Sequence, residues 1–231
     1  MIPVRVDSDK GAAPVCAGAV LVMVAVAVLM TVTGPVYVDV YRDYGLVPAR
    51  FLSAESWSLL GPLAQVQPIF THIWVHDGVL HLLVNVWWLW LFGAPIERQA
   101  GSIKFCGVLL GLSVFAAMGH VFVCASSIAP LVGSSGLVAG CMGAYVLVMP
   151  QGRILMLIPT AVPWTLRLHA AWFVGAWVCL QLILALSTRG VETEVAWWAH
   201  VTGFICGLLA GTWLRSQSGD RDADSLAPGT T

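Results

Sequence analysis

Two adjacent serines, Ser134 and Ser135, stand between glycines in the segment LVGSSGLVAGCMG, which is otherwise apolar. Hydroxyl groups are costly in an apolar environment, so they are candidates for chemistry. Pro130 and Gly133 interrupt the chain here, and a helix is predicted to begin near Ser134. Ser134 suits the capping position of that helix. Ser135 would then lie in the first turn, where free backbone N–H groups and the positive end of the helix dipole stabilise an alkoxide or an oxyanion.

A histidine in the last apolar segment, WWAHVTGFICGLLAG, can act as the base for such a serine. His200 precedes a ridge of small residues with GxxxGxxxG spacing, at positions 203, 207 and 211. Glycines at 136, 140 and 143 likewise leave one face of the predicted helix after Ser135 without side chains. Because small residues let two helix backbones approach closely, these two helices are expected to touch and to bring His200 near Ser135. A neutral imidazole there can accept the proton of a serine hydroxyl.

Two polar side chains, His81 and Asn85, lie four residues apart in the apolar segment VLHLLVNVWWLWLFG. On a helix they project from one face. Taken alone, they either bond to neighbouring helices or donate together to one acceptor. A serine, a histidine and donors on a third helix would supply a nucleophile, a base and an oxyanion hole.

The other candidate chemistries have too few residues of the right kind. His72, His76 and His81 lack the carboxylate of an HExxH pattern, so no metal is expected. The six cysteines contain no CxxC pair, which disfavours both a zinc site and a disulfide framework. No aspartate lies in an apolar segment with a Gly-x-Gly-Asp surround, so aspartyl chemistry is not predicted. We expect no cofactor, and without a basic patch we expect no nucleic-acid partner.

The composition requires a lipid environment for the elements that hold these residues. Of the 231 residues, 58% are hydrophobic and 10% are charged, and the mean hydropathy is +0.85. Soluble domains are about 45–50% apolar and about 25% charged. The sequence therefore predicts an all-α, multi-pass membrane protein in contact with the lipid bilayer. Apolar segments of spanning character occur at about 14–38, 79–97, 103–124, 135–150, 169–187 and 195–214.

The distribution of Lys and Arg predicts the orientation of these six segments. With the N-terminus in the cytoplasm, the positively charged residues divide as the positive-inside rule requires. Positions 5, 10, 98, 104, 153, 167, 215 and 221 fall inside, and only 42, 50 and 189 fall outside. The predicted organisation is a short cytoplasmic N-terminus at 1–13, a six-helix membrane domain at 14–214 and a disordered cytoplasmic tail at 215–231.

Together, these segments resemble the rhomboid family of intramembrane serine proteases, as found in bacteria. The matching segments are HLLVN with His76 before it, Gly93 and Glu97, and then GSSGLVAGCMGA and AHVTGFICG. GLVPARF and the pair Trp177 and Gln181 are also similar to bacterial members. The resemblance extends over about residues 45–212. It implies a six-helix rhomboid-like bundle in the plasma (inner) membrane, with an active site that opens to the extracytoplasmic side.

The resemblance also implies a role for each matching residue. Ser135 is the serine of the Gly-x-Ser-Gly segment and takes the nucleophile role, and His200 takes the base role without a third acid. His81 and Asn85 form the oxyanion hole with the backbone N–H of Ser135. His76 has a structural role in the first outer loop, part of which lies in the membrane. The expected partners are single-span membrane proteins, cut near the outer end of their helix.

One position departs from the family, and it bears on the alternatives. Members often carry an aromatic residue one turn after the nucleophile that packs on the catalytic histidine, but this chain has Ala139. Other groups must then orient His200, with Phe204 and Trp197 as candidates. One alternative function is a non-catalytic rhomboid-like protein that binds membrane clients, although such branches lose the serine or the histidine. A small transporter or channel would favour intramembrane charge pairs or inverted repeats, and neither is present.

Overall fold

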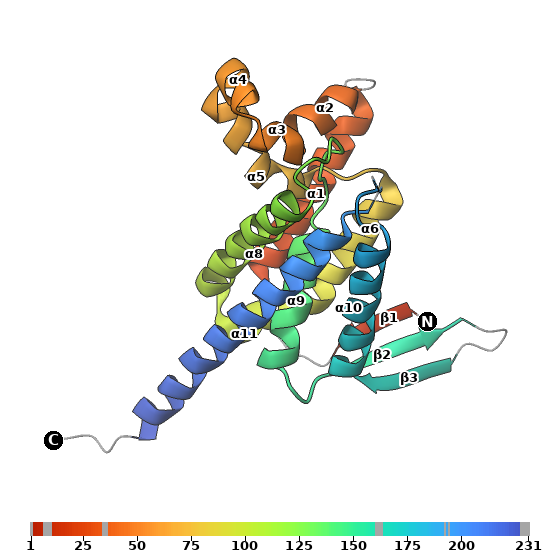
Figure 1. Ribbon diagram of the computed structural model, residues 1–231. Coiled ribbons are helices and arrows are strands. Elements are labelled where there is room, and N and C mark those ends of the chain that lie inside the picture. Colours follow the sequence, from red (N-terminus) through yellow and green to blue (C-terminus); the bar gives the residue numbers. More distant parts are fainter. Residues whose placement is uncertain are drawn as a thin grey trace.

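The computed structural model describes residues 2–6, 11–33, 37–159, 164–191, 193 and 195–226. The protein is mostly helical, and its long helices form one bundle (Figure 1). A helix begins within two residues of the first residue of each of the six predicted apolar segments. The helices are α1 (Pro14–Thr33), α6 (Val79–Trp88) continued by η2 (Leu89–Gly93) and α7 (Ala94–Ala100), α8 (Ser102–Val123), α9 (Ser135–Val148), α10 (Ala170–Ser187) and α11 (Trp197–Leu226).

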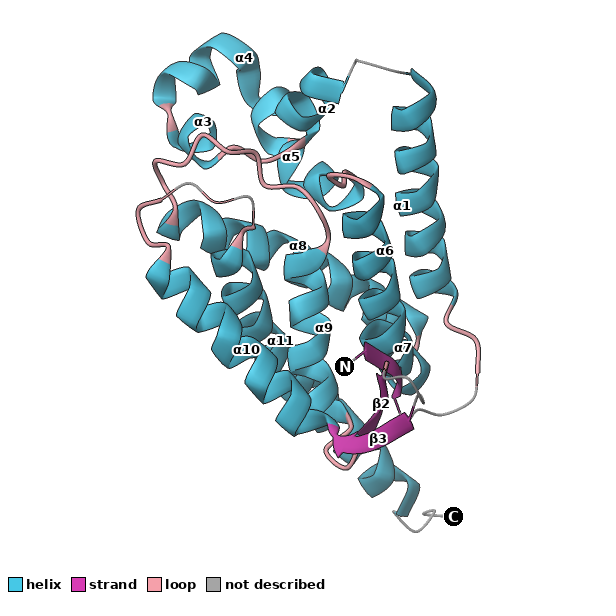
Figure 2. Ribbon diagram, turned by 90° about the vertical axis from the view of Figure 1, so that its right-hand side faces the viewer, coloured by secondary structure: helices cyan, strands magenta, loops and turns pink. Residues whose placement is uncertain are grey.

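Four helical segments are long and apolar enough to cross a membrane, namely Pro14–Thr33, Val79–Ala100, Ser102–Val123 and Ala170–Ser187. Helix α9 is apolar but has only 14 residues. It lies in the middle of the bundle (Figure 2), and almost all of its side chains are buried. Helices α6, α8, α10 and α11 pack around α9, and its first residue, Ser135, is half-buried.

The backbones of α9 and α11 are in direct contact along a shared row of glycines. A Cβ atom at Gly203 would clash with the carbonyl oxygen of Gly136, and one at Gly207 would clash with that of Gly140. A Cβ atom at Gly143 would likewise meet the carbonyl oxygen of Phe204. The predicted contact between these two helices is confirmed, and its closeness depends on the missing side chains.

The connection between α1 and α6 contains the short helices α2 (Tyr37–Tyr44), α3 (Pro48–Leu52), α4 (Ala54–Val66), α5 (Pro68–Thr71) and η1 (His72–Trp74). These helices gather at one end of the bundle (Figure 1). Leu46 exchanges two backbone hydrogen bonds with Leu131, of 3.0 and 2.9 Å, and Gly133 N donates to His72 O at 2.9 Å. This connection therefore fixes the loop that leads into Ser135.

The structure corrects the all-α prediction, because three antiparallel strands form a small sheet at the opposite end. They are β1 (Ile2–Val6), β2 (Arg153–Ile158) and β3 (Trp164–His169), in the order β1-β2-β3. In β3, Thr165 and Arg167 alternate with Leu166 and Leu168, which is the pattern of a strand with one apolar face. The all-α prediction missed the sheet because its strands are too short to span a bilayer and lie almost entirely outside the six apolar segments.

The tail also differs from the prediction. We expected disorder from residue 215, but helix α11 continues to Leu226. No proline interrupts the helical hydrogen bonds before Pro228, so the polar composition alone does not end the helix. Residues 227–231 lie outside the described residues.

The buried carboxylate of Glu97 in α7 joins the beginnings of two other helices. Its oxygens accept hydrogen bonds from Val15 N and Cys16 N, both at 2.9 Å, and from Ser102 Oγ at 2.7 Å. The two amide groups belong to the first turn of α1, where backbone N–H groups have no partner within the helix. Glu97 therefore ties α1 and α8 to α7.

Replacing Glu97 by Ala is expected to lower the free energy of unfolding by about 3 kcal/mol, because buried amide groups lose a charged acceptor. Glu97→Gln keeps one acceptor oxygen and is expected to cost about half as much. Unfolding of the purified protein in detergent, followed by circular dichroism, measures both variants. Equal stability of the Ala variant and the wild type would contradict this role.

Candidate active site

Ser135 is the first residue of α9, and the chain turns sharply just before it. Gly133 has φ of +96°, a backbone conformation that side chains disfavour. The ring of His81 also occupies the place where a Cβ atom of Gly133 would stand. The turn brings the hydroxyl of Ser135 toward His200 of α11. Ser135 also lies in the first turn of α9, where backbone N–H groups have no partner within the helix.

The side chains of Ser135 and His200 meet between α9 and α11. The distance from Ser135 Oγ to His200 Nε2 is 2.8 Å, which is a good hydrogen bond. His200 lies in the first turn of α11 and is only 6% exposed, so bulk water has little access to its ring. The structure thus brings together the two residues that the sequence singled out as nucleophile and base.

The second nitrogen of the His200 ring is bonded to Gln181 of α10. His200 Nδ1 lies 2.7 Å from Gln181 Oε1, and Gln181 is itself buried. Because an amide oxygen can only accept, Nδ1 must carry the ring proton of the neutral imidazole. Nε2 then has a free lone pair directed at Ser135 Oγ, which is the tautomer that a general base requires.

Two indole rings hold His200 in place. The ring centroids of Trp177 and Trp197 lie 5.7 and 6.0 Å from that of His200. Trp197 was a candidate from the sequence, whereas Trp177 and Gln181 were known only as part of the family resemblance. They are four residues apart on α10, so one helix face supplies both contacts. A glutamine in an otherwise apolar helix is the sequence signal for a buried polar contact, although it does not identify His200 as the partner.

His81 and Asn85 lie on the other side of the turn, against the backbone before Ser135. His81 Nδ1 accepts a hydrogen bond from Asp77 N at 3.2 Å, so the ring proton of a neutral His81 lies on Nε2, next to Gly133. Asn85 Nδ2 donates to His81 O at 2.9 Å. Since a primary amide has two N–H groups, one of them remains for another acceptor.

Ser134 stands at the N-cap position of α9, as the sequence predicted, but without the expected side-chain cap. Its side chain makes no capping hydrogen bond and is completely buried. Ser134 Oγ instead donates to Asn85 Oδ1 at 3.2 Å and lies 3.5 Å from His76 Nε2. Ser134 therefore connects the start of α9 to α6.

The two other histidines predicted from the sequence, His72 and His76, contact groups of the same connection and of α6. His72 Nδ1 lies 3.0 Å from Pro68 O, and the His76 ring packs edge-on against His81 with centroids 5.2 Å apart. Burial lowers the pKa of His76 to about 4, with the nearby His81 as a smaller cause, so His76 is neutral at pH 7. This geometry supports the packing role expected for His76.

The Rhomboid domain family model matches residues 63–217 of this chain, which is more than half of its length. The chain belongs to the rhomboid family. It is 25% identical over 205 residues to Rhomboid protease GlpG of Yersinia pestis (strain Pestoides F) and 27% identical over 207 residues to that of Pectobacterium atrosepticum. Each alignment covers 87% of this chain and 63% of the relative, so the chain spans less than two thirds of the length of these curated relatives.

Membership of this family agrees with the helical bundle and its apolar helices. The rhomboid chain is thus a multi-pass membrane protein of mostly helical fold. The comparisons place Ser135, His200, His81 and Asn85 inside the matched region, since all four lie between residues 63 and 217.

The close contact between α9 and α11 predicts that a side chain at its glycines will destabilise the protein. Gly207→Ala should force the two helices apart, because the new methyl group would clash with the carbonyl oxygen of Gly140. A loss of about 1–3 kcal/mol is expected in detergent unfolding, as for other overpacked positions. Gly111→Ala in α8 is the matched control, because no atom lies within 4 Å of the added carbon. Equal unfolding temperatures of the two variants would disprove the close contact.

Proposed function

We propose that this rhomboid chain is an intramembrane serine endopeptidase with Ser135 as the nucleophile and His200 as the general base. The observation that carries the proposal is the 2.8 Å hydrogen bond between Ser135 Oγ and His200 Nε2 in a member of this family. The bond to Gln181 supports it, because that bond leaves Nε2 unprotonated. The serine hydroxyl is a weak nucleophile by itself and requires such a base.

The reaction follows from this arrangement. Nε2 of His200 takes the proton as Ser135 Oγ attacks the scissile carbonyl carbon, and the imidazolium then gives the proton to the leaving amine. Water hydrolyses the resulting acyl-enzyme in a second, equivalent step. The oxyanion would receive hydrogen bonds from the backbone N–H of Ser135, from Nε2–H of His81 and from the remaining N–H of Asn85.

We also propose six membrane crossings with the N-terminus in the cytoplasm, and a membrane domain at 14–214. The sheet that contains β1 lies at the opposite end of the bundle from helices α2 to α5 (Figure 1), to whose connection the loop before Ser135 is bonded. The division of Lys and Arg then puts the sheet inside and the site toward the extracytoplasmic face of a bacterial inner membrane. The proposed substrates are single-span membrane proteins cut near the outer end of their helix, where the extended backbone can reach Ser135.

The decisive experiment uses purified wild-type protein, a model single-span substrate and a fluorophosphonate probe. Ser135→Ala and His200→Ala should each reduce cleavage by roughly 10³-fold or more, and the double variant should be no worse, because the two residues act as a unit. The probe should label the wild type and not the Ser135 variant. Ser134→Ala should keep most of the activity, since its hydroxyl bonds to Asn85 rather than to His200.

Two outcomes would overturn parts of this proposal. Activity in Ser135→Ala together with its loss in Ser134→Ala would identify the other serine as the nucleophile. A wild-type protein that binds the substrate but neither cleaves it nor reacts with the probe would favour the alternative function, a non-catalytic protein that binds membrane clients.

The role of Gln181 has its own test. Gln181→Leu removes the acceptor for His200 Nδ1, so kcat should fall by about tenfold or more with KM little changed. Gln181→Glu retains an acceptor oxygen and should recover most of kcat. Unfolding temperatures of both variants serve as the control for folding. A rise in KM at constant kcat would assign Gln181 to substrate contact instead.

A further inference from the structure

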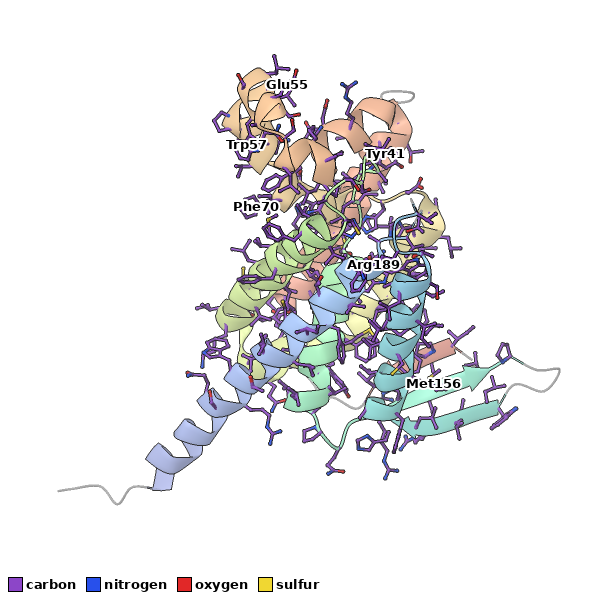
Figure 3. The ribbon with its side chains drawn as sticks, viewed as in Figure 1. Tyr41, Glu55, Trp57, Phe70, Met156 and Arg189 are labelled. Carbon is purple, nitrogen blue, oxygen red and sulfur yellow. The ribbon has the colours of Figure 1, made fainter. Side chains whose placement is uncertain are left out.

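The sheet formed by β1, β2 and β3 has two different faces. One face is apolar and consists of residues paired across the strands, such as Val6 with Ile154, Ile154 with Leu168 and Met156 with Leu166. Its part nearest the bundle is buried, since Val6, Ile154 and Met156 are all less than 7% exposed. Figure 3 shows the labelled Met156 where the sheet meets the bundle.

The opposite face carries an arginine from each strand. Arg5 and Arg167 both pair with Leu155 across the sheet, and Arg153 lies two residues before Leu155 on the same face. The three arginines are exposed, and together with Leu155 they line one hollow. We call Arg5, Arg153 and Arg167 the arginine triad.

Three like charges around one hollow repel one another unless an anion lies between them. Within the described part of the chain, no carboxylate or other hydrogen-bond partner occupies the guanidinium groups of the triad. Guanidinium groups bind phosphate oxygens through pairs of parallel N–H bonds, better than an ammonium group does. The chemistry of the hollow therefore matches a phosphate group.

The position of the sheet identifies the source of the phosphate. The hairpin of β2 and β3 extends sideways beyond α10 (Figure 1), from the level at which α10 begins. Trp164 at the outer end of β3 is 51% exposed, and Trp172 in the first turn of α10 is 78% exposed. Exposed tryptophans at the end of a membrane helix are typical of the headgroup region. The apolar face of the hairpin continues the lipid-facing surface of α10 at this level.

We propose that the arginine triad binds the phosphate of an anionic phospholipid in the leaflet next to the sheet. The apolar face of the hairpin, with Trp164, lies toward the acyl chains, while the three long arginine side chains reach the headgroup. Since the anionic lipids of a bacterial inner membrane attract basic groups near its surface, the charge of the triad fits this partner.

Native mass spectrometry of the detergent-purified, delipidated protein tests the proposal. The wild type should retain added phosphatidylglycerol and should retain phosphatidylcholine at least fivefold less. The triple variant R5Q/R153Q/R167Q should lose at least fivefold in phosphatidylglycerol occupancy. R42Q/R189Q is the matched control, because these exposed arginines lie toward the other end of the bundle, where Figure 3 labels Arg189. The control should bind as the wild type does.

Three results would overturn the proposal. They are unchanged phosphatidylglycerol occupancy in the triple variant, equal retention of the two lipids by the wild type, and an increase in unfolding temperature with inorganic phosphate that equals the increase with phosphatidylglycerol. The last result would assign the hollow to free phosphate. The single variants Arg153→Gln and Arg167→Gln give the same readout if the triple variant does not fold. Because lipid binding is measured without any substrate, the result does not depend on protease activity.

Discussion

The direct contact between the backbones of α9 and α11 is the constraint on which the rest of this structure depends. Gly140 and Gly207 leave no room for a side chain between the helices, so the separation of the two axes is set by main-chain atoms alone. Main-chain atoms have no rotamers, and this makes the separation reproducible. The hydrogen bond between Ser135 and His200 spans the same interface near one end, where a small change in helix separation would break it.

The position of the nucleophile is fixed a second time, by contacts that come from outside the two helices. The loop before Ser135 is bonded to the first long connection at Leu131 and Gly133, and Ser134 is bonded to Asn85 of α6. Neighbouring serines therefore have separate tasks. Ser134 holds the turn in place through its hydrogen bond to Asn85, while the hydroxyl of Ser135 remains directed at His200. This division explains why two hydroxyl groups occur side by side in an apolar segment.

Much of this arrangement could be predicted because glycine spacing and polar residues in apolar segments are strong signals in a membrane sequence. The meeting of Ser135 with His200 followed from two glycine rows. The contact of Gln181 with His200 could not be predicted, since the rotation of α10 about its axis is decided by packing and not by local sequence. Ser134 misled for a related reason. A serine before a helix normally caps it, but a buried acceptor on Asn85 competes successfully for the same hydroxyl.

The pairing of β1 with β2 has a consequence for how the chain is made. Ile2 pairs with Leu157, so the first strand leaves the ribosome more than 150 residues before its partner exists. The amide groups of Val15 and Cys16 likewise have no acceptor until Glu97 has been made. During synthesis β1 must remain unpaired while α1, α6, α8 and α9 are made, and closing so long a loop is slow. The sheet is thus completed late, when the chain after α9 pairs with β1.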